Sequence, residues 1–257
     1  MTKRRQNLKA TEYQRQRQQR TQAFGIGLVV VVGLGVLVFL VLRAQPGAST
    51  PPAQAVATYL QWPIVIADAF DEEANGWQYG ALTSDIADAT LTLAGGRYHW
   101  AMAPRNSVLW WSLANPSQTT TDLYAAVEAR QITGTLRSDF GLVFRLTGED
   151  YYYYQISPDA QKFALNLYYG GQWIPLIDWT ESPTPIETET LNRMAIAAEG
   201  SRFTLYLNGE VAGTVTDEHL PEGGVGVGVQ VYFDDPSGDN DGTYEFDNFE
   251  WRAPIAP

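Results

Sequence analysis

The chain has 257 residues, no cysteine and a formal net charge of −12. Without cysteine, a small disulfide-stapled domain is excluded, so stability must come from a large hydrophobic core or from a metal. Residues 1–43 hold eight basic residues and one acid, which leaves residues 44–257 with nine basic and 28 acidic residues. A body this acidic repels phosphate backbones, and we therefore expect no nucleic-acid partner.

A short basic tail and an apolar segment open the chain. Residues 1–23 are polar and rich in glutamine and arginine, whereas residues 24–42 contain no charge. As a helix, 19 residues span about 28 Å, enough for a hydrocarbon core of about 30 Å. Seven basic residues precede this segment and only Arg43 follows it closely, which places the N-terminus in the cytoplasm. The segment exceeds the usual length of a signal peptide's apolar region. We therefore expect an uncleaved, single-pass anchor in the cell membrane.

The remainder of the chain predicts a linker and one β-rich domain. Residues 43–60 are rich in proline, alanine, serine and threonine, as a spacer would be. From residue 61 to 253, short alternating segments are separated by turn signals such as Gly95-Gly96, Gly170-Gly171 and Asn208-Gly209. No apolar stretch with helical period follows the membrane segment. This pattern predicts an all-β sandwich or barrel in a single domain.

Four consecutive tyrosines, Tyr151–Tyr154, lie in one predicted strand. Because strand side chains alternate, Tyr152 and Tyr154 are expected to face the core, and Tyr151 and Tyr153 the opposite side. Flat aromatic rings beside amide and guanidinium donors suit a sugar ring, so the second face is a candidate ligand-binding face. Its members are Arg145, Tyr151, Tyr153, Gln155, Asn166 and Tyr168. The alternative is a purely structural role, because cross-strand aromatic pairs also stabilise a sheet.

Several segments together resemble a known family. "DAFDEEANGWQYG", "SDFGLVFRLTGEDYYYYQIS" and "YEFDNFEW" are similar to the concanavalin A-like, laminin G-like jelly-roll modules. More narrowly, they resemble the bacterial group related to the 3-keto-disaccharide hydrolase domain, over residues 68–252. The resemblance implies a two-sheet antiparallel β-sandwich. Members of this family commonly hold glycans or proteins, and some carry calcium at the rim.

An acidic stretch near the C-terminus is a candidate calcium site. "DDPSGDNDG" supplies Asp234, Asp235, Asp239 and Asp241 on a loop bent by glycine. Calcium takes about six to eight oxygen ligands, and clustered aspartates can supply several of them. The spacing lacks the glutamate that closes an EF-hand loop. A solvated acidic hairpin loop is the alternative.

A second acidic string invites comparison with glycoside hydrolases. Glu245, Asp247 and Glu250 form an E-x-D-x-x-E pattern like that of the family 16 enzymes, which share the jelly-roll fold. A β-bulge would bring Glu250 onto the same face as Glu245 and Asp247. Glycoside hydrolysis requires two carboxyl groups on one face, close to the scissile bond. However, the string lies in the final strand and overlaps the "FDNF" segment typical of non-catalytic modules. His99 and His219 have no catalytic motif around them, so no catalytic residue is predicted.

The sequence thus predicts a membrane-anchored binding module displayed outside the cell membrane. Its expected partner is a carbohydrate or another component of the cell envelope. A glycosidase acting through the E-x-D-x-x-E string and a structural or protein-interaction domain are the alternatives.

Overall fold

The computed structural model describes residues 52–134, 138–233 and 240–255. The predicted tail, the predicted transmembrane helix and residues 43–51 of the predicted linker lie outside these ranges and stay predictions. Within them, no helix is long and apolar enough to cross a membrane. The chain divides into two compact units, and the second, Ala48–Pro257, contains all the elements below.

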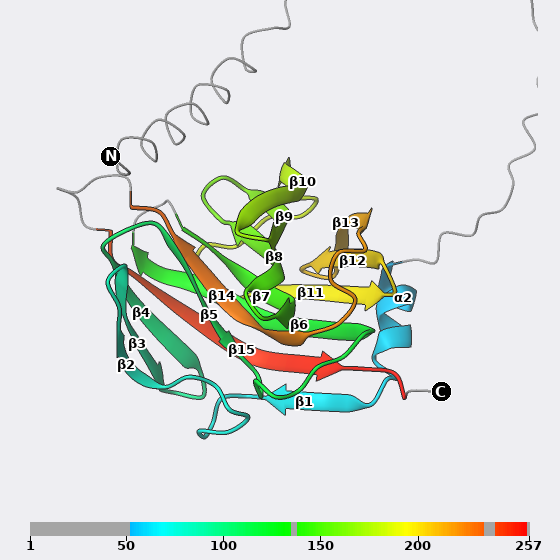
Figure 1. Ribbon diagram of the computed structural model, residues 1–257, viewed down its shortest axis with the longest axis horizontal. Coiled ribbons are helices and arrows are strands. Elements are labelled where there is room, and N and C mark those ends of the chain that lie inside the picture. The colour runs from blue at the N-terminus through cyan, green and yellow to red at the C-terminus, as the bar shows by residue number, and fades with distance from the viewer. Residues whose placement is uncertain (1–51, 135–137, 234–239, 256–257) are drawn as a thin grey trace, which may run out of the picture. The chain divides into compact units, whose positions relative to one another are not determined.

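Fifteen strands of the described residues form two antiparallel sheets (Figure 1). The nine-stranded sheet has the order β13 (Glu210–Thr216), β12 (Arg202–Leu207), β11 (Asn192–Glu199), β6 (Leu123–Gly134), β15 (Gly242–Arg252), β4 (Tyr98–Pro104), β3 (Ala87–Leu93) and β2 (Gly80–Thr83), with β1 (Ile64–Asp68) paired to β15. The six-stranded sheet has the order β10 (Gln172–Glu181), β9 (Lys162–Tyr169), β8 (Asp150–Ser157), β7 (Ser138–Thr147), β14 (Gly224–Val231) and β5 (Val108–Leu113). The predicted two-sheet antiparallel sandwich is confirmed.

Alternating apolar residues from both sheets form one core. Tyr152 and Tyr154 of the tyrosine run are fully buried in it, as their position in the alternation predicts. Tyr152 stacks on Phe144 of the neighbouring strand and meets Phe203 of the other sheet edge-on, with ring centroids 4.8 Å apart. Burial of such large rings removes much apolar surface from water and is the main stabilising contribution to this fold.

The predicted hairpin turns are present. Asn208 and Gly209 have φ of 48° and 88°, the positive pair that a tight hairpin between twisted strands requires, and they join β12 to β13. Gly170 and Gly171, with φ of 56° and 78°, join β9 to β10 in the same way. The register that follows from this second turn places Trp173 directly opposite Tyr168.

The loop after β1 is organised by one carboxylate. Asp68 is buried and accepts hydrogen bonds from the Phe70 amide (2.7 Å), Asn75 Nδ2 (2.8 Å) and Trp77 Nε1 (2.9 Å). The "DAFDEEANGW" segment therefore encodes a single closed loop. Its two aromatic rings, Phe70 and Trp77, return to the core.

The end of the predicted linker is helical and packed. Helix α2 (Pro52–Tyr59) brings Tyr59 against the outer face of the nine-stranded sheet, where its ring stacks on Tyr124 with centroids 5.9 Å apart. The Tyr59 hydroxyl donates to Glu199 Oε2 at 2.8 Å. Arg252 secures the chain after the helix by donating to the carbonyls of Leu60 and Trp62. Composition alone indicated a spacer here, because an eight-residue helix owes its stability to tertiary packing rather than to its sequence.

The contact of α2 is expected to contribute to stability. Tyr59→Ala removes a buried ring and its hydrogen bond, so the free energy of unfolding should fall by about 2–4 kcal/mol in urea denaturation. Leu60→Ala, one residue away and exposed, should change it by less than about 0.5 kcal/mol. Equal effects of the two substitutions would show that the helix does not dock.

Candidate functional site

A bulge in β7 overturns the prediction for Arg145. The pairing of β7 shifts register after Phe144, and Arg145 has a φ of 50°, in the left-handed region. The alternation therefore reverses. Arg145 points inward and is only 1% exposed, whereas Leu146 packs with the outer cluster of the six-stranded sheet. Arg145 was expected on the open face and does not lie there.

Arg145 instead binds three chain segments: the one before β6, the turn between β11 and β12, and the one between β13 and β14. Its guanidinium donates to the carbonyls of Thr121 (2.8 Å), Gly200 (2.6 Å) and Leu220 (3.0 Å), and it lies 5.0 Å from the ring centroid of Phe203. Burial lowers the pKa of this guanidinium, yet arginine stays protonated in proteins. Carbonyl groups of these segments thus satisfy the buried charge of Arg145. The role of Arg145 is therefore structural.

Two further residues of the predicted face are covered. Tyr153 and Gln155 lie on the outer side of β8 as predicted, but Tyr153 is fully buried and Gln155 is 2% exposed. The Tyr153 hydroxyl lies 3.2 Å from the Asp139 carbonyl and 3.3 Å from that of Gly228, so its ring crosses β7 against the sheet. Burial raises the pKa of this hydroxyl well above its usual value. Neither side chain presents a surface to a ligand in this conformation.

Tyr151 and Tyr168 pack together with Trp173, which is not among the six predicted residues of this face. Tyr151 was expected on an open face, but it is only 7% exposed, whereas Tyr168 is partly exposed. Tyr151 and Tyr168 stack with centroids 5.2 Å apart, and Trp173 meets both rings edge-on at 5.8 and 5.1 Å. Trp173 is 42% exposed, so its indole gives this group of packed rings a face toward solvent. We call Tyr151, Tyr168 and Trp173 the aromatic platform. Asn166, partly exposed, lies on the same face of β9 as Tyr168.

The signal for Trp173 was present in the sequence. The Gly170-Gly171 turn fixes the register of the hairpin, and counting outward from it pairs Trp173 with Tyr168. Trp110 and Trp111, adjacent residues of β5 at the other edge of the sheet, point to opposite sides of it, as alternation along a strand requires. Trp110 packs against the core and Trp111 against the outer cluster.

The acidic string lies on the outer face of the other sheet. In β15 the register shifts between Asp247 and Glu250, and Asn248 has a φ of 48°. This bulge places Glu245, Asp247 and Glu250 on one face, because Phe249 and Trp251 beside them are in the core. The bulge that the glycosidase alternative required is therefore present.

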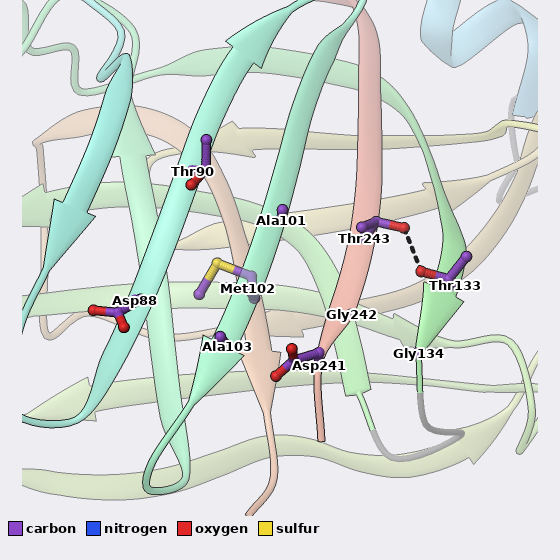
Figure 2. A pocket seen from close by; sticks show the side chains of 10 residues that line it. All are labelled: Asp88, Thr90, Ala101, Met102, Ala103, Thr133, Gly134, Asp241, Gly242 and Thr243. Atoms are coloured by element: carbon purple, nitrogen blue, oxygen red, sulfur yellow. Dashed lines mark hydrogen bonds between the residues drawn. The ribbon is translucent and has the colours of Figure 1, made fainter. Parts of the chain in front are cut away.

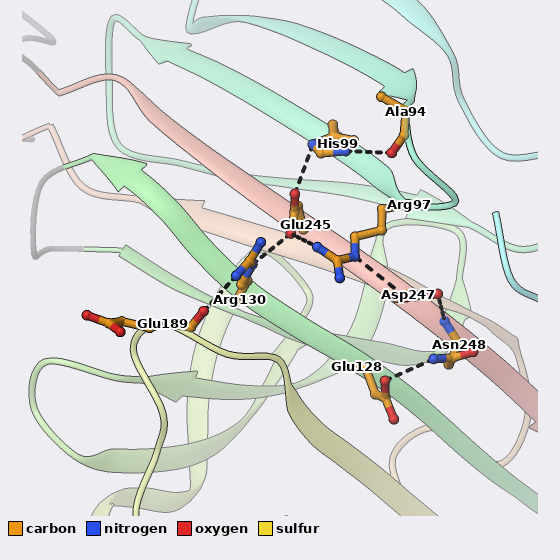
Figure 3. A network of polar contacts seen from close by, with 9 residues as sticks. All are labelled: Ala94, Arg97, His99, Glu128, Arg130, Glu189, Glu245, Asp247 and Asn248. Atoms are coloured by element: carbon orange, nitrogen blue, oxygen red, sulfur yellow. Dashed lines mark hydrogen bonds and ion pairs between the residues drawn. The ribbon is translucent and has the colours of Figure 1, made fainter. Parts of the chain in front are cut away.

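Basic partners neutralise these carboxylates. Glu245, 5% exposed, accepts from Arg130 Nε at 2.7 Å and Arg97 Nη1 at 2.9 Å, and His99 Nδ1 lies 3.4 Å from it (Figure 3). Burial opposes ionisation of Glu245, but the hydrogen bond from Arg130 and the nearby positive charges outweigh it and lower its pKa. The arginines thus hold Glu245 as a carboxylate.

The remaining two carboxylates also have partners. Burial raises the pKa of Asp247, against the opposing effect of the Asn248 amide (2.7 Å) and of Arg97. Glu250 pairs with Arg193 at 3.5 Å and with Arg252. The string is therefore part of an ion-pair network across β4, β15, β6 and β11. Figure 3 shows the part of this network around Glu245 and Asp247.

A hollow of about 520 Å³ lies on the nine-stranded sheet (Figure 2). Its lining consists of small and hydroxyl-bearing residues, one methionine and two carboxylates, namely Asp88, Thr90, Ala101, Met102, Ala103, Thr133, Gly134, Asp241, Gly242 and Thr243. None of the three carboxylates of the acidic string lines it. Asp88 is paired with Arg105 at 2.8 Å. The hollow is thus separate from the string, which argues against a glycosidase cleft there.

The candidate calcium ligands are only partly described. Asp241 lines the hollow, whereas Asp234, Asp235 and Asp239 lie outside the described residues. Within the described ranges, no three His, Cys, Asp or Glu side chains are grouped so that they could hold a metal ion. The calcium site stays a prediction.

Comparison with known proteins identifies the fold. No protein-family model matches the chain. No curated protein matches it either. Among solved structures, a carbohydrate-binding module of Bacillus subtilis, CBM66, superposes with a TM-score of 0.54 at 18% identity, over 70% of this chain and 98% of that module. The fold is a concanavalin A-like sandwich.

Enzymes share this fold as well. The laminarinase catalytic domain of Thermotoga petrophila superposes with a TM-score of 0.54 at 11% identity, over 76% of this chain and 99% of that domain. The β-glucanase of Bacillus licheniformis gives 0.52 at 14% identity, over 74% and 98%. Such identities show the fold alone, and the narrower relation to the 3-keto-disaccharide hydrolase group stays a prediction.

Arg145 should matter for stability. Arg145→Met leaves three buried carbonyls without their donor, and the free energy of unfolding is expected to fall by about 3–5 kcal/mol. Arg105→Met, which breaks only exposed contacts with Asp88 and with the Ser84 carbonyl, should cost less than about 1 kcal/mol. Similar losses in urea denaturation would contradict the structural role.

Glu245 should confer a pH-dependent stability. Its pKa is lowered by folding, so its contribution is fully present above the unfolded-state value of about 4.3 and is lost as the pH falls through the lower folded-state value. Glu245→Gln should therefore lower the free energy of unfolding by about 1–3 kcal/mol at pH 7, and the difference from the native protein should shrink below about pH 4. A pH-independent difference would contradict the ion-pair assignment, and Asp88→Asn serves as the exposed control.

Proposed function

We propose that this protein is a glycan-binding module that recognises sugar rings at the aromatic platform. The observation that carries the proposal is the exposure of Trp173 beside two packed tyrosines. The rings of Tyr151 and Tyr168 hold the indole in place, so little side-chain freedom is lost when a ligand binds. C–H groups of a sugar then stack on the exposed indole, and Asn166 offers amide donors and an acceptor to hydroxyl groups.

The setting of the platform is compatible with a polymeric ligand. It lies at β8, β9 and β10, and β10 is the edge strand of the six-stranded sheet. A chain of sugars can therefore extend past the platform without meeting a further strand of the described sheet. The fold is also shared with a carbohydrate-binding module and with glucanases.

We also propose that the module is displayed outside the cell membrane by the apolar segment 24–42. The uncharged length of this segment and the basic residues before it support that placement. The partner would then be a glycan of the envelope or of the surroundings. Calcium bound at the acidic loop would be an addition to this function and not a condition of it.

The glycosidase alternative has less support. The bulge gathers Glu245, Asp247 and Glu250 on one face, but arginines neutralise Glu245 and Glu250, and none of the three lines the hollow. A general acid and a nucleophile need direct access to the glycosidic bond. The indole of Trp173, in contrast, meets solvent without rearrangement.

Trp173→Ala should weaken glycan binding by about 10- to 100-fold, the loss expected for an exposed aromatic contact. The protein is screened on a glycan array with calcium and with EDTA, and the dissociation constant is then measured for the best ligand. Tyr169→Ala is the matched control, because Tyr169 is equally exposed at 43% but contacts His219 instead of the platform. Absence of binding from a folded sample, or equal loss in both variants, would refute the proposal.

A further inference from the structure

The aromatic platform is bordered by acidic side chains. Asp150 immediately precedes Tyr151 and accepts a hydrogen bond at 2.8 Å from the Gly170 amide, in the turn that leads to Trp173. Glu149, exposed, lies in the same turn as Asp150. Glu222, also exposed, is held next to this turn because the Thr147 hydroxyl donates to its carbonyl at 2.8 Å. The Asp150 carboxylate thus lies at the turn that leads to Trp173, and Glu149 and Glu222 lie in the segments next to Asp150 and Thr147.

Basic side chains lie elsewhere in the part of the chain that the structure describes. On the six-stranded sheet, Arg145 is buried and Lys162 pairs with Glu181 at the opposite end of β9. The other described basic residues belong to the nine-stranded sheet or its turns: Arg97, Arg105, Arg130, Arg193, Arg202 and Arg252. Five of these six form the ion pairs given above. The positive charge of Arg202 is near Tyr59 and Tyr206, on the outer face of that sheet, where it opposes the rise in pKa of both hydroxyls that burial causes.

We infer that the aromatic platform selects uncharged polysaccharides and discriminates against carboxylated or sulfated ones. This inference rests on the proposed function and names the ligand class of the same site. Like charges near a binding face lower affinity and slow association, and the 28 acids against nine basic residues of 44–257 add a long-range repulsion. An anionic sugar would also find no described guanidinium or ammonium group at the platform to pair with its charge.

The test compares polymers that differ only in charge. Dextran, soluble β-1,3-glucan and hydroxyethyl cellulose are each paired with a carboxymethylated derivative, and dissociation constants are measured for the full chain in detergent. Where the protein binds a neutral polymer, it should bind that polymer at least about tenfold more tightly than the carboxymethylated derivative at about 20 mM salt. The difference should narrow at about 500 mM salt, where the screening length is only a few ångströms.

A charge reversal locates the effect. Glu149→Lys should raise affinity for the carboxymethylated polymer about three- to tenfold at low salt and leave affinity for the neutral polymer unchanged. Glu72→Lys changes the net charge equally, but in the exposed loop between β1 and β2, and should have less than a twofold effect. Equal effects of the two reversals would overturn a local origin of the selectivity.

The outcomes separate this inference from the function on which it rests. Binding of the carboxymethylated polymer as tightly as the neutral one at low salt, with loss in Trp173→Ala, would keep the glycan-binding function and overturn the charge selectivity. No binding of any polymer, or binding that Trp173→Ala does not change, would overturn both. The expected result is a preference for the neutral polymer that Glu149→Lys narrows about three- to tenfold at low salt.

Discussion

This module depends on one constraint. The two sheets must pack on each other through the alternating core residues of β7, β8 and β14. Phe144 and Tyr152 enter the core side by side and meet Phe203 of the opposite sheet. The alternation in β7 breaks directly after Phe144. A bulge there turns Arg145 inward, at the end of the sandwich. Buried carbonyls satisfy the guanidinium, which makes the burial of its charge tolerable.

The two outer faces have different characters because different residues cover them. On the nine-stranded sheet, α2 packs over part of the surface and an ion-pair network around Glu245 occupies another part. On the six-stranded sheet, Tyr153 lies flat against the strands, and the exposed Trp173 lies on the edge strand β10 beside Tyr168. Recognition is therefore expected at an edge of the module and away from the acidic string.

The distribution of charge along the chain agrees with the predicted membrane anchor. The predicted tail before the anchor is basic, and residues 44–257 after it carry 28 of the 29 acidic residues. The described basic side chains are largely used in ion pairs on one sheet. The surface near Trp173 is left with carboxylates, which favours uncharged ligands over polyanions. The predicted anchor would keep such a domain close to the membrane while the platform meets its ligand.

The sequence by itself determined the fold class, the hairpins and the inner residues of most strands. Alternation and positive-φ turn residues are local properties, so the burial of Tyr152 and Tyr154 and the turn at Asn208-Gly209 could be predicted. Only the tertiary structure decided which outward residues meet solvent. Arg145 turned inward because one extra residue in a bulge reverses every later side chain, and the strand pattern does not mark that position. The covering of Tyr153 and the docking of α2 depend on contacts between distant segments, which no local pattern encodes. The place of Trp173 opposite Tyr168, in contrast, follows from a local turn.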